Sequence, residues 1–477
     1  MSTLLSEASL LHSYTPKYSP SYTPKKNYSP KKSNLSKKTD YKLLKKTENK
    51  MMMMNYPAPI HHLLEGTPTR FHAATAQAVF PALATYVPGD VVGKFPLNNE
   101  TYRLNCGFFS LLCGDSASGK SLVDRVVNRI MAPIVKEDQL RRLKYNEYLE
   151  KLERATKHTK RLPKKPHVFY RSLSANITEA ALLERLQWAE QNGMGCACHI
   201  LMAELDQLIT MCGSADLASA YIRLMFKGES TGKELKTSAS HAGIPCALNL
   251  NVSCTPGVAR TRLGGKAAYD GTTGRVNAIL MPTIDGVESL LNFEAVMDFT
   301  KEFDNRLTAT LNSLGSFHGL VDTPPELAEA VRETYERLTR YYYTTLDQKR
   351  LATWTLRSSI IAWRKGLLMM MMQGGVYTPD IADFVACSME EDMAAKQALW
   401  GEELLMDKPI ELLAHPSVGR RSLLLEALPQ EFTAEQANEI RVKSGAKDNM
   451  GLTRNLLARW KYLGYIEDTE KGYRKVK

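Results

Sequence analysis

The chain has 477 residues, of which 44% are hydrophobic, and this is enough for about two or three domains with buried cores. No apolar run approaches the roughly 20 residues of a membrane-spanning helix, and the N-terminus lacks the apolar segment of a signal peptide. The eight cysteines show no paired metal-ligand spacing, and we expect small buried residues in a reducing compartment; a metal or redox site at the close pair Cys196 and Cys198 is the weak alternative. We therefore expect a cytoplasmic protein with no membrane partner.

The formal charge of +11 is concentrated at the N-terminus. The first 50 residues hold eleven lysines against three acidic residues and repeat a short motif, as in Tyr14-Thr15-Pro16-Lys17. Such a segment cannot bury enough apolar surface to offset its chain entropy, so residues 1–60 are predicted to be a disordered basic tail. The tail is either an arm that binds nucleic acid or a solvated extension, and the methionines at 51–54 leave the true start codon open.

The most informative stretch follows an apolar run at 108–113. It reads Gly114, Asp115, Ser116, Ala117, Ser118, Gly119, Lys120, Ser121. Glycines at both ends of a turn ahead of a helix let consecutive backbone N–H groups converge on phosphate oxygens. We predict a phosphate-binding loop (P-loop) in which Lys120 reaches the β- and γ-phosphates of ATP and Ser121 holds Mg²⁺. An ordinary glycine- and serine-rich turn between a strand and a helix is the alternative.

Acidic residues leave a strand downstream of this loop. Two helices are predicted first, an amphipathic one at 122–130 and a highly charged, solvated one at 136–161, for which a nucleic-acid-facing role is the alternative. An apolar strand at 198–203 then ends in Glu204 and Asp206. One carboxylate for Mg²⁺ and one for a hydrolytic water would serve ATP hydrolysis, and either residue fits either role. A pair of helix-capping acids is the alternative.

Two further polar residues follow along the predicted core. Asn251, near the end of a strand at 246–253, is a candidate sensor of the γ-phosphate or a core residue. Arg275, in a glycine-rich turn before a strand at 277–281, is a candidate phosphate contact in the same or a neighbouring subunit, or a surface arginine. The alternation of strands and helices predicts a parallel α/β core over residues 61–320.

The rest of the chain is predicted to form two more units. Residues 321–415 have apolar residues at helical spacing, which predicts a helical subdomain with Trp354, Trp363 and the methionines in its core. Residues 416–477 show helices followed by a hairpin, the pattern of a winged helix. Basic residues on its third helix and in the hairpin are candidate DNA contacts: Arg454, Arg459, Lys461, Arg474 and Lys475. A role in protein contacts, or as a lid, is the alternative.

Several short stretches follow one another in an order seen in one family: 114–121, 174–178, 203–208, 253–257 and 271–275. Over about residues 65–410, the chain resembles the P-loop domain-of-unknown-function family found beside primases and helicases in bacterial mobile elements and phages. The resemblance implies a RecA-like, oligomeric ATPase in replication or mobilisation of such an element, with primase or other replication proteins as partners. It also implies that Glu204 matches the acidic residue of the family and Arg275 its late arginine.

We therefore expect a Mg²⁺-dependent ATPase that acts on DNA as a helicase-like motor or loader. One alternative is a nucleotide-gated DNA-binding regulator or partition protein that does not translocate. Another is a small-molecule kinase of the same fold, although no acceptor pocket can be read from the sequence.

Overall fold

A computed structural model describes residues 55–158, 163–233, 241–283, 298–405, 425, 427–443, 449–462, 465–469 and 472–476. The predicted basic tail lies almost wholly outside the described residues. The first described helix, α2 (Ala58–Leu64), begins inside the range predicted for the tail. Its N-cap is Pro57, and Pro59 lies in its first turn, where the missing N–H costs no hydrogen bond within the helix.

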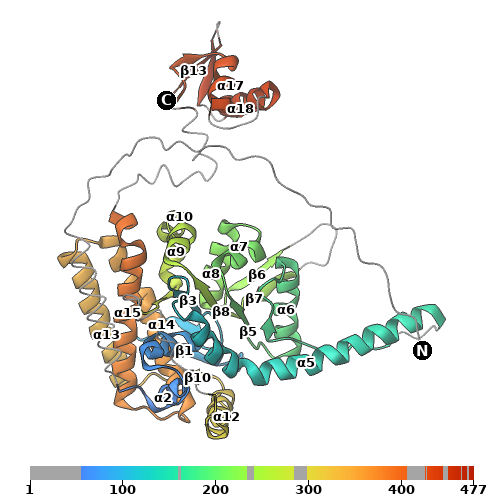
Figure 1. Ribbon diagram of the computed structural model, residues 1–477, viewed down its shortest axis with the longest axis vertical. Helices are drawn as coiled ribbons and strands as arrows, with labels where there is room; N and C mark the ends of the chain where they lie inside the picture. The colour runs from blue at the N-terminus through green and yellow to red at the C-terminus, as the bar shows by residue number, and fades with distance from the viewer. Residues whose placement is uncertain are drawn as a thin grey trace, which may run out of the picture.

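A five-stranded sheet forms the centre of the molecule (Figure 1). All neighbouring strands in it run parallel. The strand order is β4 (Ser172–Leu173), β5 (Cys198–Met202), β8 (Leu248–Cys254), β3 (Phe109–Cys113) and β9 (Asn277–Leu280). Strands β3 and β8 are buried along their whole length, as expected where helices cover both faces of a parallel sheet. The predicted α/β class with a parallel sheet is thereby confirmed.

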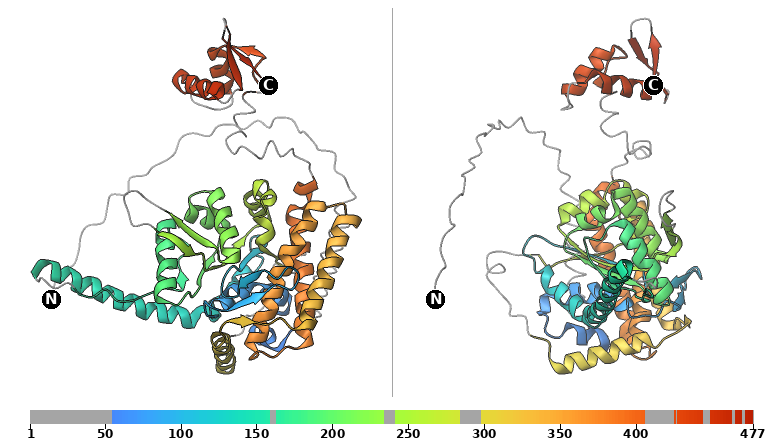
Figure 2. Two further views of the ribbon diagram at one scale, coloured as in Figure 1. Left: turned by 180° about the vertical axis from the view of Figure 1, so that it is seen from behind. Right: turned by 90° about the vertical axis from the view of Figure 1, so that its right-hand side faces the viewer.

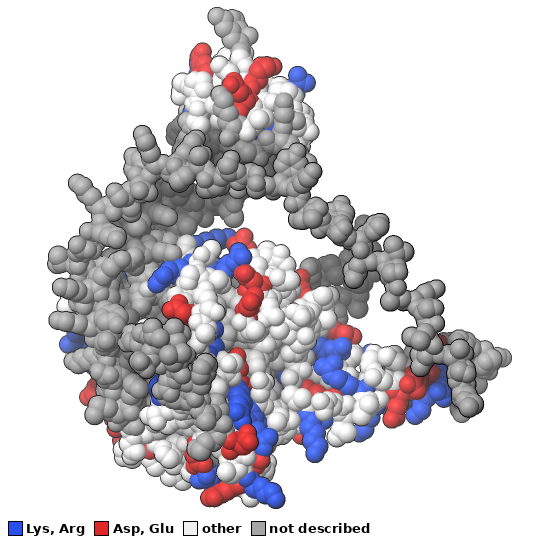
Figure 3. Space-filling view, viewed as in Figure 1, with Lys and Arg blue, Asp and Glu red and all other residues white. Residues whose placement is uncertain are grey.

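Helix α5 (Lys120–His158) follows β3 and runs without a break through Pro133. The sequence predicts two helices here, and this was wrong because the buried side chains of Met131 and Ile134 hold the chain helical on both sides of the proline. The second half of α5 extends beyond the sheet (Figure 1). Basic and acidic side chains alternate along this projection (Figure 3), which fits the predicted solvated helix.

The remaining elements around the sheet are helices and short strands. Residues 167–170 are irregular in the structure, and the edge strand β4 begins at Ser172. The helices are α3 (His72–Ala78), α4 (Phe80–Ala84), α6 (Glu179–Asn192), α7 (Leu205–Cys212), α8 (Ala215–Lys227), α9 (Pro256–Leu263), α10 (Lys266–Tyr269) and α12 (Lys301–Gly315), with short turns η1 (Thr69–Phe71) and η2 (Thr273–Arg275). A small three-stranded sheet contains β1 (Val92–Lys94), β2 (Thr101–Arg103) and β10 (Leu320–Val321). A two-stranded sheet contains β6 (Ser230–Lys233) and β7 (His241–Pro245).

Three long helices pack beside one another next to edge strand β9 (orange in Figure 2). They are α13 (Pro325–Arg340), which continues into η3 (Tyr341–Thr345), α14 (Lys349–Met372) and α15 (Pro379–Leu405). Trp363, Met369 and Met371 are fully buried, which confirms their predicted place in a core. That core is shared with the sheet, so the boundary predicted near residue 320 does not separate two cores.

The described C-terminal residues form a small unit with its own core. Helices α17 (Ala434–Lys443) and α18 (Met450–Tyr462) pack on a three-stranded antiparallel sheet of β11 (Glu431–Phe432), β13 (Gly472–Lys475) and β12 (Ile466–Thr469). Leu457 and Trp460 of α18 pack with Phe432 and Ile466 in this core. The predicted hairpin is confirmed and gains β11 as a third strand, whereas most of residues 416–428 lie outside the described part of the chain.

Candidate functional site

The glycine-rich loop connects the last residue of β3 with the first residue of α5. Ala117 and Gly119 have φ angles of 65° and 86°, so the backbone turns twice through the left-handed region before the helix begins. A Cβ on Gly119 would lie 2.6 Å from Cζ of Phe71, and one on Gly114 would lie 2.6 Å from Cβ of Met281. Close packing therefore requires glycine at both ends of the loop.

Lys120 places its ammonium group inside this loop. Its Nζ donates hydrogen bonds to the carbonyl oxygens of Gly114 and Asp115, each at 2.7 Å, and lies 3.5 Å from Oγ of Ser118. The next residue, Ser121, is exposed. The loop thus surrounds a cation with backbone groups and leaves a hydroxyl beside it.

A pocket of about 450 Å³ lies over the loop. Its walls are formed by residues 116–121 and 203–206 together with Cys254, Thr255 and Val258. Three helices begin there, each directly after a neighbouring strand of the sheet: α5 after β3, α7 after β5 and α9 after β8. The first turn of a helix presents unbonded N–H groups and a partial positive charge, so the pocket favours an anion.

Both acidic residues predicted from the sequence line this pocket. Glu204 precedes α7, and its backbone N–H donates to Oε1 of Gln207 at 3.2 Å, as in a helix cap. Oδ1 of Asp206 accepts a hydrogen bond from Nε of Arg262 at 2.7 Å. Glu204 makes no ion pair with the other described residues. The two carboxylates are therefore brought together with the loop but have different partners.

Arg262 and Asp124 were missed by the sequence reasoning. Arg262 lies in the last turn of α9, the helix that begins at the pocket, and position on that helix was the available signal. Asp124 lies one turn after Lys120 on α5, where burial raises the pKa of its carboxyl to about 6 although Lys120 opposes the shift. A carboxylate four residues after the loop lysine could have been noted from helical spacing alone.

Asn251 is not at the pocket. It lies three residues before the end of β8, where Nδ2 donates to the carbonyl oxygen of Ala78 at 2.7 Å and Oδ1 lies 2.8 Å from Nε2 of His199. Its burial and these partners correspond to the core alternative, not to a γ-phosphate sensor. Burial also lowers the pKa of His199 to about 4, which keeps this ring neutral.

Arg275 is not brought together with the loop either. It precedes β9, whose first residue, Asn277, pairs with Ser110 near the start of β3, whereas the loop follows the end of β3. The half-buried guanidinium donates to the carbonyl oxygen of Gly271 at 2.7 Å. Arg275 thus lies at the amino-terminal end of the parallel strands, whereas the loop lies at their carboxyl-terminal end. A role at the site of a neighbouring subunit stays a prediction.

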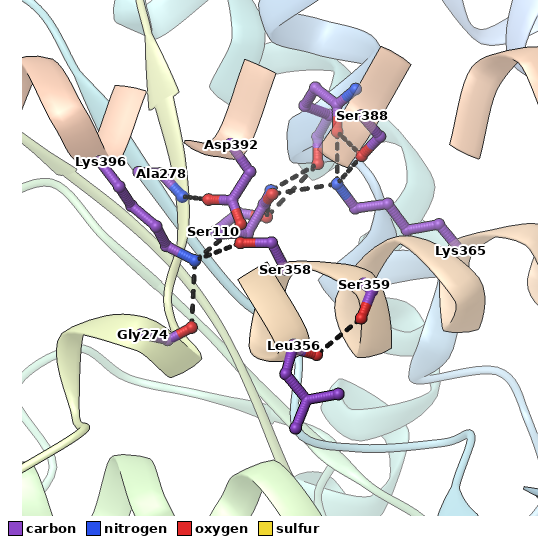
Figure 4. Close-up of polar contacts among 12 residues, drawn as sticks. Ser110, Gly274, Ala278, Leu356, Ser358, Ser359, Lys365, Ser388, Asp392 and Lys396 are labelled. Carbon is purple, nitrogen blue, oxygen red and sulfur yellow. Dashed lines mark hydrogen bonds and ion pairs between the residues drawn. The ribbon is translucent and has the colours of Figure 1, made fainter. Parts of the chain in front are cut away.

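A buried polar layer joins the sheet to α14 and α15 (Figure 4). Nζ of Lys365 donates to Gln77, to Oδ1 of Asn277 at 3.0 Å and to Oγ of Ser388 at 2.9 Å. Nζ of Lys396 lies 2.7 Å from Asp392, whose other carboxylate oxygen accepts from the N–H of Ala278 at 2.8 Å. Burial lowers the pKa of Lys365 to about 7. Both lysines are fully buried, so they hold the sheet and the long helices together by hydrogen bonds and are not accessible to a ligand.

The predicted DNA contacts lie on the C-terminal unit, but several are engaged by acids. Arg474 forms ion pairs with Glu431 at 2.9 Å and Glu467 at 3.5 Å, and Lys461 pairs with Asp468. Nζ of Lys475 donates to the carbonyl oxygen of Leu428 at 2.5 Å. Arg454 is exposed on α18, and the side chain of Arg459 lies outside the described part of the chain. Among the candidates that can be placed, Arg454 is exposed and makes no ion pair with the other described residues.

A second set of metal-ligand residues lies away from the pocket. His61, His62 and Glu65, at the end of α2, have ligand atoms within 4.8 Å of one another. Arg306 donates to both Glu65 and His62. Because a guanidinium already occupies these acceptors, the cluster is poorly suited to a cation.

Comparison with known proteins finds no family model and no curated protein that matches this chain. Among the described residues, no helix combines the length and apolar character needed to cross a membrane. The function must therefore be argued from the pocket itself.

Proposed function

We propose that the protein is an ATPase that binds ATP in the pocket over the glycine-rich loop, which acts as a P-loop in a RecA-like core. The observation that carries the proposal is the convergence of the loop, Lys120 and the starts of α5, α7 and α9 on one pocket. Phosphates require such a set of backbone N–H donors around a cation. The volume, about 450 Å³, falls in the usual range for small-molecule sites of about 300–1,000 Å³.

The oxygen donors of the pocket fit Mg²⁺, which prefers hydroxyl and carboxylate oxygens. Ser121 and Glu204 both line the pocket, and Glu204 has no ion-pair partner among the described residues. When bound, Mg²⁺ would neutralise charge on the β- and γ-phosphate oxygens. Asp206 is less suited as a ligand because it already accepts from Arg262.

Each residue of the pocket then has a distinct role. Lys120 exchanges its contacts with Gly114 and Asp115 for phosphate oxygens, and the N–H groups of the loop bind the same phosphates. Glu204 holds the metal or orients the attacking water. Asp206 supports that arrangement from the first turn of α7.

The test is steady-state ATP hydrolysis by the full chain and by Lys120→Ala and Glu204→Gln. Removing a general base or water-orienting group costs about 100-fold or more in turnover, so Glu204→Gln should lose turnover but keep ATP binding. Lys120→Ala should weaken binding roughly 10- to 100-fold, as expected for a hydrogen bond between charged groups. Lys266→Ala is the control, because Lys266 pairs with Asp216 outside the pocket. Hydrolysis that is equal in all four proteins contradicts the proposal.

We further propose that hydrolysis is coupled to DNA as in a helicase-like motor or loader of replication or element mobilisation. Support comes from α17 and α18 followed by a hairpin, the order of a winged helix, with Arg454 exposed on α18. Because Glu431 and Glu467 neutralise Arg474 of the hairpin, Arg454 of α18 should contribute more to DNA affinity than Arg474 does. Arg454→Ala should lower the salt dependence of DNA binding by about one ion, and Arg474→Ala by less.

A nucleotide-gated DNA-binding switch is the second candidate, and one observation favours it. Helix α9 begins at the pocket, and two hydrogen bonds join it to α15. Arg260 of α9 donates to the carbonyl oxygen of Leu399 at 3.2 Å, and Nε1 of Trp400 on α15 donates to the carbonyl oxygen of Ala259 at 3.2 Å. Nucleotide binding can therefore act on α15 without turnover. Slow hydrolysis that DNA does not stimulate, with nucleotide-dependent DNA binding, would select the switch over the motor.

A further inference from the structure

An ion pair on the wall of the pocket joins α7 to α9. Nε of Arg262 donates to Oδ1 of Asp206 at 2.7 Å, and the two side chains are 45% and 49% exposed. A half-exposed pair of this kind contributes little to stability, because water screens it and two long side chains lose freedom. The position of the pair is more informative, because Asp206 lines the pocket in which the phosphates are proposed to bind.

Helix α9, which carries Arg262, is held in place by hydrogen bonds to α15. Two residues earlier, Arg260 donates to the carbonyl oxygens of Leu399 and Ala398 of α15, at 3.2 and 3.4 Å. Between these arginines and the pocket, Ala259 is fully buried and its carbonyl oxygen accepts from Trp400. Because α9 is held on one side by α15, Arg262 can hold Asp206 in place on the other side.

The charges of the pocket explain why such a residue is needed. A nucleotide brings several negative charges to a site whose wall already carries the carboxylates of Glu204 and Asp206. Two unit charges a few ångströms apart near a protein surface repel by an amount that matters for binding. A neighbouring guanidinium offsets the repulsion from Asp206, while Glu204, which caps α7, makes no ion pair with the other described residues.

We propose that Arg262 is a positioning residue that neutralises and orients Asp206, so that Glu204 is the carboxylate presented to a bound Mg²⁺–nucleotide. The inference rests on the proposed ATP site and adds to it a residue that acts through Asp206. Arg262 contacts the carboxylate and not the nucleotide.

The experiment is a charge-balance series on the full chain, with Mg²⁺–ATP binding measured by calorimetry and hydrolysis measured as kcat and KM. Arg262→Ala leaves Asp206 uncompensated and should weaken ATP binding about fivefold to tenfold. Adding Asp206→Asn removes that charge and should restore affinity to within about twofold of wild type. Arg262→Lys keeps the charge without the guanidinium geometry and should fall between Arg262→Ala and wild type.

Lys266→Ala is the matched control. Lys266 pairs with Asp216 at 2.8 Å with side-chain exposures of 46% and 59%, close to those of the Arg262–Asp206 pair, and neither residue lines the pocket. Its removal should lower thermal stability as little as Arg262→Ala does and leave ATP affinity unchanged. A merely structural role for Arg262 would make the two variants alike.

Each outcome is decisive. Wild-type protein that binds no ATP overturns the proposed function and this inference together. Wild-type protein that binds ATP through Lys120, with Arg262→Ala indistinguishable from Lys266→Ala, overturns the inference alone. Equal weakening by Arg262→Ala with and without Asp206→Asn also overturns it, because Arg262 would then act on the nucleotide directly.

Discussion

Two lysines on helices that pack beside the same sheet have opposite surroundings. Lys120 lies at the carboxyl edge, where its ammonium is held by backbone carbonyls of a loop that lines an open pocket. Lys365, on α14, is fully buried, and its ammonium donates only to the neutral side chains of Gln77, Asn277 and Ser388. The first can exchange its partners for a ligand, whereas the second cannot leave them without exposing buried polar groups.

Partners and solvent access, not residue type, thus distinguish Lys120, which we propose binds phosphate, from Lys365, which is buried. Burial lowers the pKa of Lys365 to about 7, a value that in an open cleft would suggest a catalytic amine. Its closed surroundings instead assign it to the contact between the sheet and the long helices (Figure 4). The predictions below separate these two regions, from the largest expected effect to the smallest.

The largest effect is expected at the buried lysine. Lys365→Ala leaves a cavity and removes the hydrogen-bond donor from Gln77, Asn277 and Ser388, so it should lower the free energy of unfolding by about 3–5 kcal/mol. Urea denaturation of the full chain measures this loss. Lys266→Ala, at an exposed ion pair, should change stability by less than about 0.5 kcal/mol. Similar losses in both variants would contradict the structural role of Lys365.

The titration of Lys365 should also contribute to the pH dependence of the free energy of unfolding. Its pKa is about 7 in the folded chain against 10.5 for the free side chain, so between these values the unfolded chain binds more protons. Stability should therefore rise with pH in this window because of Lys365, by up to about 1.4 kcal/mol per pH unit. Lys365→Met should remove this contribution. An unchanged slope between pH 7 and 9 would show that the folded protein keeps Lys365 charged.

The loop should respond to a single methyl group. Gly119→Ala places a Cβ at a φ of 86° and against the ring of Phe71, so it should cost about 1–2 kcal/mol of stability and impair ATP binding. Gly213→Ala is the matched control, with a φ of 81° but no atom within 4 Å of the new Cβ. Equal ATP affinity in the two variants would argue against a binding role for the loop.

The smallest effect, of opposite sign, is expected at Asp124. Burial raises its pKa from 3.8 to about 6, so the ionised carboxylate destabilises the folded chain above pH 6, and this cost disappears as the pH falls to 3.8. Asp124→Asn should therefore stabilise the protein by about 1 kcal/mol at pH 7 and have no effect near pH 4. Denaturation at the two pH values checks this. A loss of stability at pH 7 would mean that Lys120 holds Asp124 as an ion pair.

The sequence predicted those features that depend on local pattern. The loop at the end of β3 and the strand β5 with its acidic end each follow from neighbouring residues. The position of Arg275 could also have been predicted, because a residue before a parallel strand lies at the edge opposite the loop. Asn251 was a candidate for the pocket because it lies near the end of β8, but its side chain is held in the core by Ala78 and His199.

Other features depend on contacts between distant parts of the chain. Ser388 donates to Gln77 across 311 residues, and Lys365 reaches Asn277 across 88. The pairing of Arg262 with Asp206 likewise joins two helices that follow different strands. Nothing in the local pattern of 349–372 distinguishes a buried lysine from an exposed one. The hydrogen-bond partners of each residue determine its role, and these partners are brought together only when the chain folds.

The most direct test of the account is equilibrium binding of Mg²⁺–ATP to the full chain, measured by calorimetry beside Lys120→Ala. The account predicts one site per chain for the wild type and a loss of roughly 10- to 100-fold in affinity for the variant, whose unfolding free energy should be nearly unchanged. Binding of equal affinity to both proteins, or no binding to the wild type, would contradict the assignment of the pocket over residues 114–121 as a nucleotide site.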